Sequence, residues 1–218
     1  PTGFSARTKI ELETYSEKKC RELFARFVKN ETWQVPTLIA KQTNAFVDSI
    51  MSSSDPRMKY ISPGALERWK PENNFFLKYR TPEFIEIRKR LYQKELELVG
   101  EMHRAGVRFL TGSDIPAAYM YPGFSLHDEL GLLVRAGLTP FEALQAATRN
   151  PAKYLDLLNE LGTIEKGKLA DLILLDAIPL ADIGNTKRIA AVVFEGKYLS
   201  KEAREKMLAD IVVVVNKK

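Results

Sequence analysis

Two helical patterns flank the stretch Val107-Arg108-Phe109-Leu110-Thr111-Gly112-Ser113-Asp114, which decides the fold class. Its first half is mostly apolar and its second half is small and polar, as expected for a short strand that ends at the edge of a sheet. The preceding pattern predicts a helix over residues 82–105, with Pro82 in the first turn and Gly106 directly after the end. Helix and strand in this order predict an α/β fold with a parallel sheet.

The same alternation extends upstream and downstream. Residues 13–29 are predicted to form a helix, and Thr14 with Glu17 three residues later predicts a capping box at its start. Residues 33–39 are β-prone, and another helical pattern follows Asp114. Thr139 is expected to cap a further helix.

From Leu161 the pattern becomes rich in turns and β-prone. Glu195-Gly196 predicts a hairpin turn between two strands. The β-prone segments are residues 172–175, 189–194 and 211–215. We therefore expect α/β units over residues 1–160 and a β module over residues 161–218, with 211–215 as an edge strand or an aggregation-prone tail.

Composition excludes several classes of protein. The 218 residues are 45% hydrophobic and 28% charged, which is ordinary for a folded protein. No apolar run approaches the roughly 18 residues of a membrane helix, so no membrane partner is expected. The net charge of +5 comes from basic residues interspersed with acidic ones, which is typical of solvated helix faces, so no nucleic-acid partner is expected. The single cysteine, Cys20, lies on the apolar side of a helix and is interpreted as a core residue.

Asp114 is the candidate functional residue, because the carboxyl ends of parallel strands gather the chemistry of such folds. A turn or helix-capping role is the alternative. The two histidines, His103 and His127, are interpreted as structural or packing residues, and they do not share metal-ligand spacing. A catalytic zinc site needs about three protein ligands, and the sequence does not visibly contain them.

Several motifs resemble the C-terminal half of the metal-dependent amidohydrolase superfamily, in its imidazolonepropionase-like and Xaa-Pro dipeptidase-like branch. These motifs are Gly112-Ser113-Asp114, Leu126-His127-Asp128-Glu129-Leu130, the segment 136–152 and the segment 161–172. Residues 33–38 resemble the seventh barrel strand of that branch. The resemblance is dense over 107–198, patchier over 13–106 and absent over the tail.

The resemblance implies the C-terminal portion of a (β/α)8 TIM barrel, plus part of a small β-sandwich domain. It implies a divalent metal, zinc by expectation, with one or two ions in the complete enzyme. Asp114 would be a metal ligand and the general base and acid for metal-activated water. The family's other metal ligands would precede Pro1. We therefore expect the chain to be part of a longer enzyme and to need either that missing N-terminal part or self-association. Any leader would also precede Pro1, so a cytoplasmic and an exported location both stay open.

These observations predict a hydrolase of C–N bonds in amides or peptides, acting on a small-molecule or dipeptide amide. The alternative is a catalytically inert fragment that acts only as a structural or association partner. The loop over residues 115–124 carries Tyr119 and Tyr121, which either border the substrate pocket or pack under the loop. Residues 40–82 either cover the barrel mouth or form a packed surface excursion.

Overall fold

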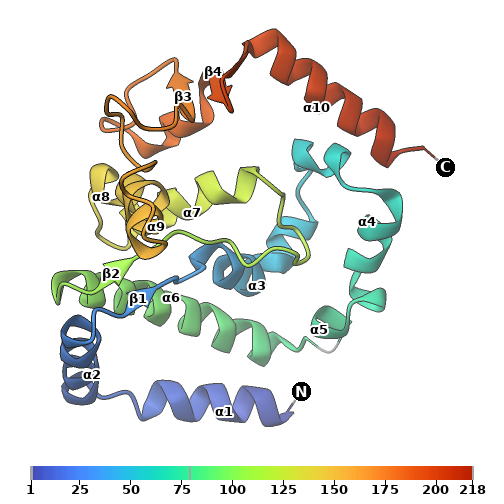
Figure 1. Ribbon diagram of the computed structural model, residues 1–218. Coiled ribbons are helices and arrows are strands. Elements are labelled where there is room, and N and C mark those ends of the chain that lie inside the picture. Colours follow the sequence, from blue (N-terminus) through green and yellow to red (C-terminus); the bar gives the residue numbers. More distant parts are fainter. Residues whose placement is uncertain (1, 79, 218) are drawn as a thin grey trace.

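The structure, a computed structural model, describes residues 2–78 and 80–217, so Pro1, Tyr79 and Lys218 lie outside it. The described part is mainly helical, with one pair of parallel strands and one three-stranded antiparallel sheet (Figure 1). None of the described helices is long and apolar enough to cross a bilayer.

The parallel pair confirms the predicted α/β class. β1 (Trp33–Gln34) pairs with β2 (Arg108–Phe109), with Trp33 opposite Arg108. The upstream strand is shorter than the predicted 33–39. Pro36 has no N–H to donate, and Thr37 adopts a left-handed φ of 48°, so the ladder stops and a helix begins at Leu38.

The chain opens with two helices, α1 (Thr2–Glu13) and α2 (Glu17–Lys29). The predicted capping box at Thr14 is wrong. Because α1 continues to Glu13, the Thr14 hydroxyl donates back to the Ile10 carbonyl at 2.7 Å. Ser16 caps α2 instead, accepting from the Lys19 amide at 3.5 Å.

Residues 40–82 contain more helix than the sequence suggested. The helices here are α3 (Leu38–Met51), η1 (Pro56–Tyr60), α4 (Pro63–Trp69), η2 (Pro71–Asn73) and α5 (Phe75–Lys78). Three of them begin at a proline, which suits the first turn of a helix because its missing N–H is not needed there.

The long helix α6 (Pro82–Arg104) is confirmed. Downstream of β2 come α7 (Phe124–Arg135), α8 (Pro140–Ala147) and α9 (Arg149–Tyr154). The cap predicted at Thr139 is confirmed, as a capping box in which Thr139 and Glu142 bond each other's backbone amides.

The main core lies where α3, α6 and α7 meet β2. Among its members are Leu38, Val99, Phe109 and Leu133. Cys20 is half-buried and packs against this cluster, which confirms its interpretation as a core residue. The core therefore holds the two strands and the helices that follow them as one packed unit.

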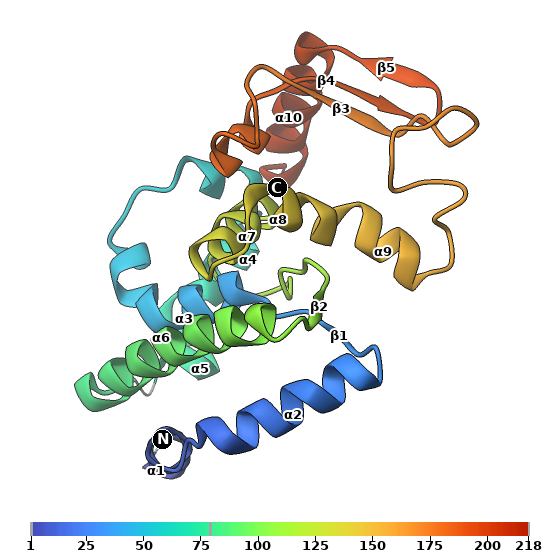
Figure 2. The same cartoon turned by 90° about the vertical axis from the view of Figure 1, so that its left-hand side faces the viewer.

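The downstream module is a small sheet in the order β3 (Leu172–Leu175), β4 (Ile189–Phe194) and β5 (Lys197–Leu199). Glu195-Gly196 makes the predicted hairpin turn, with φ values of 50° and 73°. A short helix, η3 (Ile183–Lys187), precedes β4. Figure 2 shows this sheet at the opposite end of the molecule from α1 and α2.

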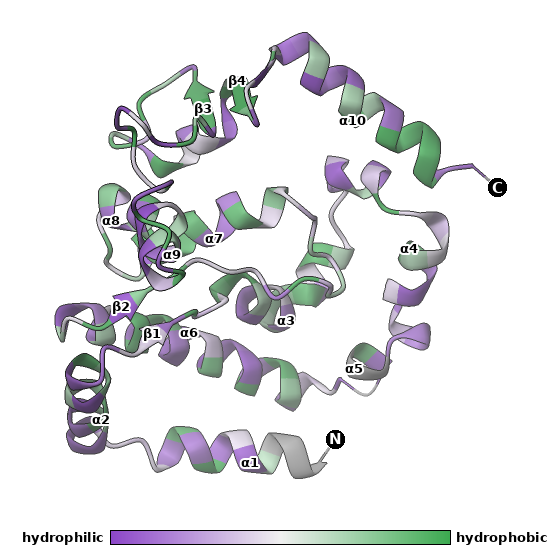
Figure 3. Cartoon of the chain, in the orientation of Figure 1, coloured by the Kyte–Doolittle hydropathy of each residue, from purple (hydrophilic) through white to green (hydrophobic). Residues whose placement is uncertain are grey.

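The strand predicted over residues 211–215 is wrong. These residues end the helix α10 (Lys201–Val215), which starts with Ser200 accepting from the Ala203 amide at 3.2 Å. A helix that starts with a good cap continues through β-branched residues at a modest cost. Figure 3 shows the apolar residues at the far end of α10, where Val213 and Val214 are exposed. A second sheet of a β-sandwich is not seen among residues 2–78 and 80–217.

Candidate functional site

Asp114 lies just beyond the carboxyl end of β2. Leu110 donates to the Gln34 carbonyl at 2.9 Å, so the two parallel strands end at the same edge. The Asp114 side chain is exposed, and its backbone has a left-handed φ of 59°. Within the described chain it has no hydrogen-bond or ion-pair partner. A carboxylate held at a strand end without a protein partner is available to bind a ligand.

Gly112, two residues before Asp114, lets the segment after β1 approach the segment after β2 closely. A Cβ atom on Gly112 would lie 2.6 Å from Cγ1 of Val35 and 3.7 Å from Cγ2 of Thr37. The segment after β1 therefore packs directly against the segment after β2. We call these two segments, residues 35–39 and 110–122, the rim segments.

An apolar cavity of about 670 Å³ opens beside the second rim segment. Its walls come from α3, from residues 60–77, from the loop that starts at Ile115, the residue after Asp114, and from Val215 at the end of α10. Trp69 and Leu77 are among the apolar lining residues. Asp114 itself is not one of the residues that line this cavity.

The two tyrosines of the loop pack under it. Trp69 contacts Tyr119 and Tyr121, with ring centroids 5.3 and 6.0 Å apart. Tyr121 is only 1% exposed. The excursion over residues 40–82 therefore supports the loop that follows Asp114, and both tyrosines also line the polar cavity described next.

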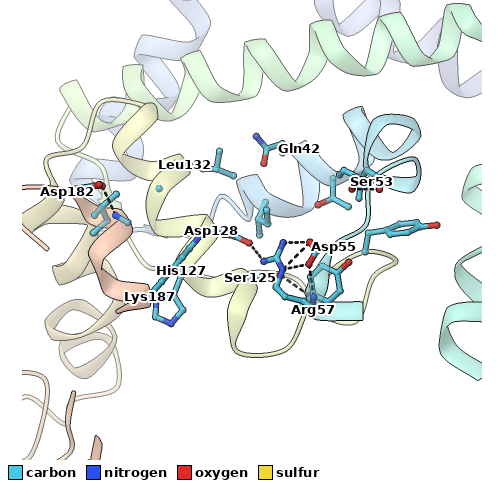
Figure 4. A pocket seen from close by; sticks show the side chains of 18 residues that line it. Gln42, Ser53, Asp55, Arg57, Ser125, His127, Asp128, Leu132, Asp182 and Lys187 are labelled. Atoms are coloured by element: carbon cyan, nitrogen blue, oxygen red, sulfur yellow. Dashed lines mark hydrogen bonds and ion pairs between the residues drawn. The ribbon is translucent and has the colours of Figure 1, made fainter. Parts of the chain in front are cut away.

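A second, more polar cavity of about 540 Å³ lies between α3, α7 and η3. Figure 4 shows Arg57 lying between Asp55 and Asp128. The Arg57 guanidinium contacts Asp55 at 2.7 Å and Asp128 at 2.6 Å, and lies 4.4 Å from the Tyr121 ring centroid. Lys187 contacts the other Asp128 oxygen at 2.6 Å. This network joins the excursion, α7 and the downstream module.

The charges in this network are mutually stabilised. Burial alone would raise the pKa of Asp128, but hydrogen bonds from Lys187 and Arg57 hold that pKa below its usual value. Hydrogen bonding to Arg57 lowers the pKa of Asp55 as well. Burial and nearby Lys187 lower the pKa of His127, whose Nδ1 is buried without a hydrogen-bond partner. His127 is therefore neutral near pH 7 and lines the cavity as a polar wall.

Glu129 is a buried carboxylate that the sequence analysis did not single out. Its side chain is 0% exposed, and its two oxygens accept from the Leu38 amide at 3.0 Å and the Ile39 amide at 2.6 Å. Burial raises its pKa to about 7, although the two backbone hydrogen bonds oppose that rise. The signal in the sequence was an acidic residue inside the apolar stripe of α7, four residues after a small polar one.

The described residues do not assemble a complete metal centre. Among the described residues, no group of three or more His, Cys, Asp and Glu side chains could hold a metal ion. His103 lies 3.5 Å from Glu142 on α8, which fits the structural role predicted for it. Asp114 is thus a single available carboxylate, and the donor set around it does not fit a metal on its own.

Comparison with known proteins places these features in a family. A protein-family model, described as the amidohydrolase family, matches residues 36–199 of this chain. Adenine deaminase 2 of Jannaschia sp. (strain CCS1) is 29% identical over 131 residues, which is 60% of this chain and 20% of that protein. Imidazolonepropionase of Agrobacterium fabrum (strain C58) is 38% identical over 91 residues, which is 39% of this chain and 20% of that protein.

A solved structure agrees with the sequence matches. A putative prolidase from Bifidobacterium longum superposes with a TM-score of 0.50 at 31% identity, over 62% of this chain and 35% of that one. The matched segments span about a fifth of the length of the two curated relatives. Because the family match covers well over half of the 218 residues, the chain belongs to the amidohydrolase family.

Proposed function

We propose that this chain forms part of a hydrolase of C–N bonds and that Asp114 is its catalytic carboxylate. The observation that carries the proposal is an exposed carboxylate in the segment that follows β2, without a partner among the described residues, in a chain of this family. The proposal is supported by the names of the relatives, an adenine deaminase, an imidazolonepropionase and a putative prolidase.

The substrate class follows from the same features. A small amide or a dipeptide fits the prolidase relationship, and the apolar cavity beside the Asp114 loop suits an apolar substituent on that amide. In the hydrolysis, water adds its oxygen to the carbonyl carbon, the C–N bond breaks, and the leaving nitrogen takes a proton. Asp114 accepts the proton from the attacking water and delivers it to the leaving nitrogen.

The proposal also includes a divalent metal ion and a barrel of which this chain is one part. A divalent metal, with zinc the expected ion, would use Asp114 as one ligand. The remaining ligands would come from polypeptide outside these 218 residues, because the described residues do not form a site by themselves. Residues 1–160 would form the C-terminal part of a (β/α)8 barrel, and residues 161–218 part of a composite β domain.

The test measures turnover by the Asp114→Asn variant of the gene-encoded protein. Asp156→Asn is the matched control, since Asp156 is also an exposed aspartate with a φ of 59°. We expect Asp114→Asn to lower kcat on a panel of N-acyl amino acids, dipeptides and cyclic amides by about 100-fold or more. The Asp156→Asn protein should stay within about twofold of the parent. Equal turnover of the two variants would contradict the assignment of Asp114.

A second candidate function is that of a catalytically inert association partner. It is favoured by the apolar side chains that are exposed on the downstream module. Ile164 is 87% exposed and Tyr198 66% exposed. Metal analysis separates the two candidates. Retention of about one or two zinc ions through dialysis, with hydrolysis, supports the enzyme, whereas no zinc and no hydrolysis in the gene-encoded protein supports the partner.

A further inference from the structure

Helix α7 carries two buried polar side chains on one face, and each binds the backbone of a different rim segment. Ser125 is 2% exposed, and its Oγ accepts from the Tyr121 amide at 2.9 Å. Glu129, one turn later and fully buried, accepts from the amides of Leu38 and Ile39. One helix therefore holds the backbone on both sides of the strand edge.

The Glu129 contact is costly, which makes its presence informative. A buried carboxylate normally has a cationic partner, and in the described chain Glu129 has none within ion-pair distance. The first turn of α3 also lacks the usual local cap, because the Thr37 side chain makes no capping hydrogen bond. Thr37 is left-handed, with a φ of 48°, so its backbone does not have the extended conformation of a capping residue, and Glu129 accepts from the first amides of α3 instead. The long-range cap differs from a local one in that it fixes α3 relative to α7.

The two backbone segments that α7 binds are both connected to the segment that carries Asp114. On one side, the anchored start of α3 directly follows Val35 and Thr37, which contact the Gly112 position two residues before Asp114. On the other side, Tyr121 lies near the end of the loop that begins immediately after Asp114. A shift of α7 would therefore move the backbone before and after Asp114 together.

We propose that Ser125 and Glu129 are positioning residues that fix the Asp114 carboxylate at the strand edge. This inference rests on the proposed function. Glu129 holds the rim segment of β1, and Ser125 holds the far end of the rim segment of β2. Neither side chain touches the substrate. Their effect on turnover passes through the placement of Asp114, where a displacement of about 1 Å can cost about 100-fold in rate.

The test compares Glu129→Gln and Ser125→Ala with Ser200→Ala in the gene-encoded protein. Glu129→Gln replaces one acceptor oxygen with a donor, and Ser125→Ala removes one hydrogen bond. Ser200→Ala removes a helix cap in the downstream module and serves as the control. We expect kcat to fall about tenfold or more in the two α7 variants, with KM within about twofold, and to stay unchanged in the control.

A second readout does not depend on turnover. Amide hydrogen exchange should accelerate in residues 35–41 and 110–122 of both α7 variants, and only near α10 in the control. If Glu129→Gln does not fold, Ser125→Ala decides the case, because it changes no charge.

The outcomes separate this inference from the proposed function. Loss of turnover in Asp114→Asn, with normal kcat and normal rim exchange in the α7 variants, overturns the positioning role alone. Unchanged turnover in Asp114→Asn overturns the proposed function, and the positioning inference falls with it.

Discussion

The buried carboxylate of Glu129 predicts an unusual dependence of stability on pH. Its pKa is about 7 in the folded protein, against an ordinary value of 4.5. Between these two values the folded state holds a proton that the unfolded state has lost. The free energy of unfolding therefore falls as pH rises through this window, which is opposite to the behaviour of a salt-bridged carboxylate.

The size of the effect follows from the two pKa values. Between pH 5 and pH 8, Glu129 should remove roughly 2 to 3 kcal/mol from the free energy of unfolding, at about 1.4 kcal/mol per pKa unit. Full burial means that solvent screening does not reduce this figure. Glu129→Gln carries no titrating group, so the difference between parent and variant isolates the contribution of this one side chain.

The assay is urea denaturation followed by circular dichroism, at pH 5, 6, 7 and 8, on the parent protein and Glu129→Gln. We expect the stability of the parent relative to the variant to decrease steadily across the series. Parallel pH profiles for the two proteins would refute the reasoning, since they would mean that Glu129 is either solvated or held ionised throughout.

Further outcomes concern packing, charge and assembly. Gly112→Ala should destabilise the protein by about 1–3 kcal/mol, because the new methyl group meets Val35, whereas Gly131→Ala has open space and should be neutral or stabilising in thermal melts. Arg57→Ala should cost about 2 kcal/mol in urea denaturation, because it removes the charged hydrogen bonds to two half-buried carboxylates, Asp55 and Asp128. Its control, Arg21→Ala, breaks an exposed pair and should cost about 0.5 kcal/mol or less. The 218-residue chain alone should associate or fold poorly in size-exclusion chromatography and circular dichroism, since a parallel pair with open edges needs covering; a cooperatively melting monomer would contradict this.

Local signals in the sequence predicted several elements correctly. The proline, glycine and spacing of apolar residues around 82–106 gave the long helix α6, and the box at Thr139 gave the start of α8. Glu195-Gly196 gave the hairpin because few residues accept two consecutive positive φ values. The errors occurred where a neighbouring element overrode the local pattern. The β-branched tail is helical because it continues from a capped helix, and Thr14 belongs to the end of α1.

The sequence by itself determined the family, the alternation of helices and strands and the place of Asp114 after a strand, because short motifs and local patterns are enough to predict them. Only the tertiary structure decided that Asp114 has no partner within the described chain, that Asp128 links Arg57 to Lys187, and that Glu129 caps a helix about ninety residues away. The apolar stripe of α7 shows that Glu129 lies on the buried face, but nothing in one sequence says which distant amides such a carboxylate binds, because those contacts depend on how the helices pack.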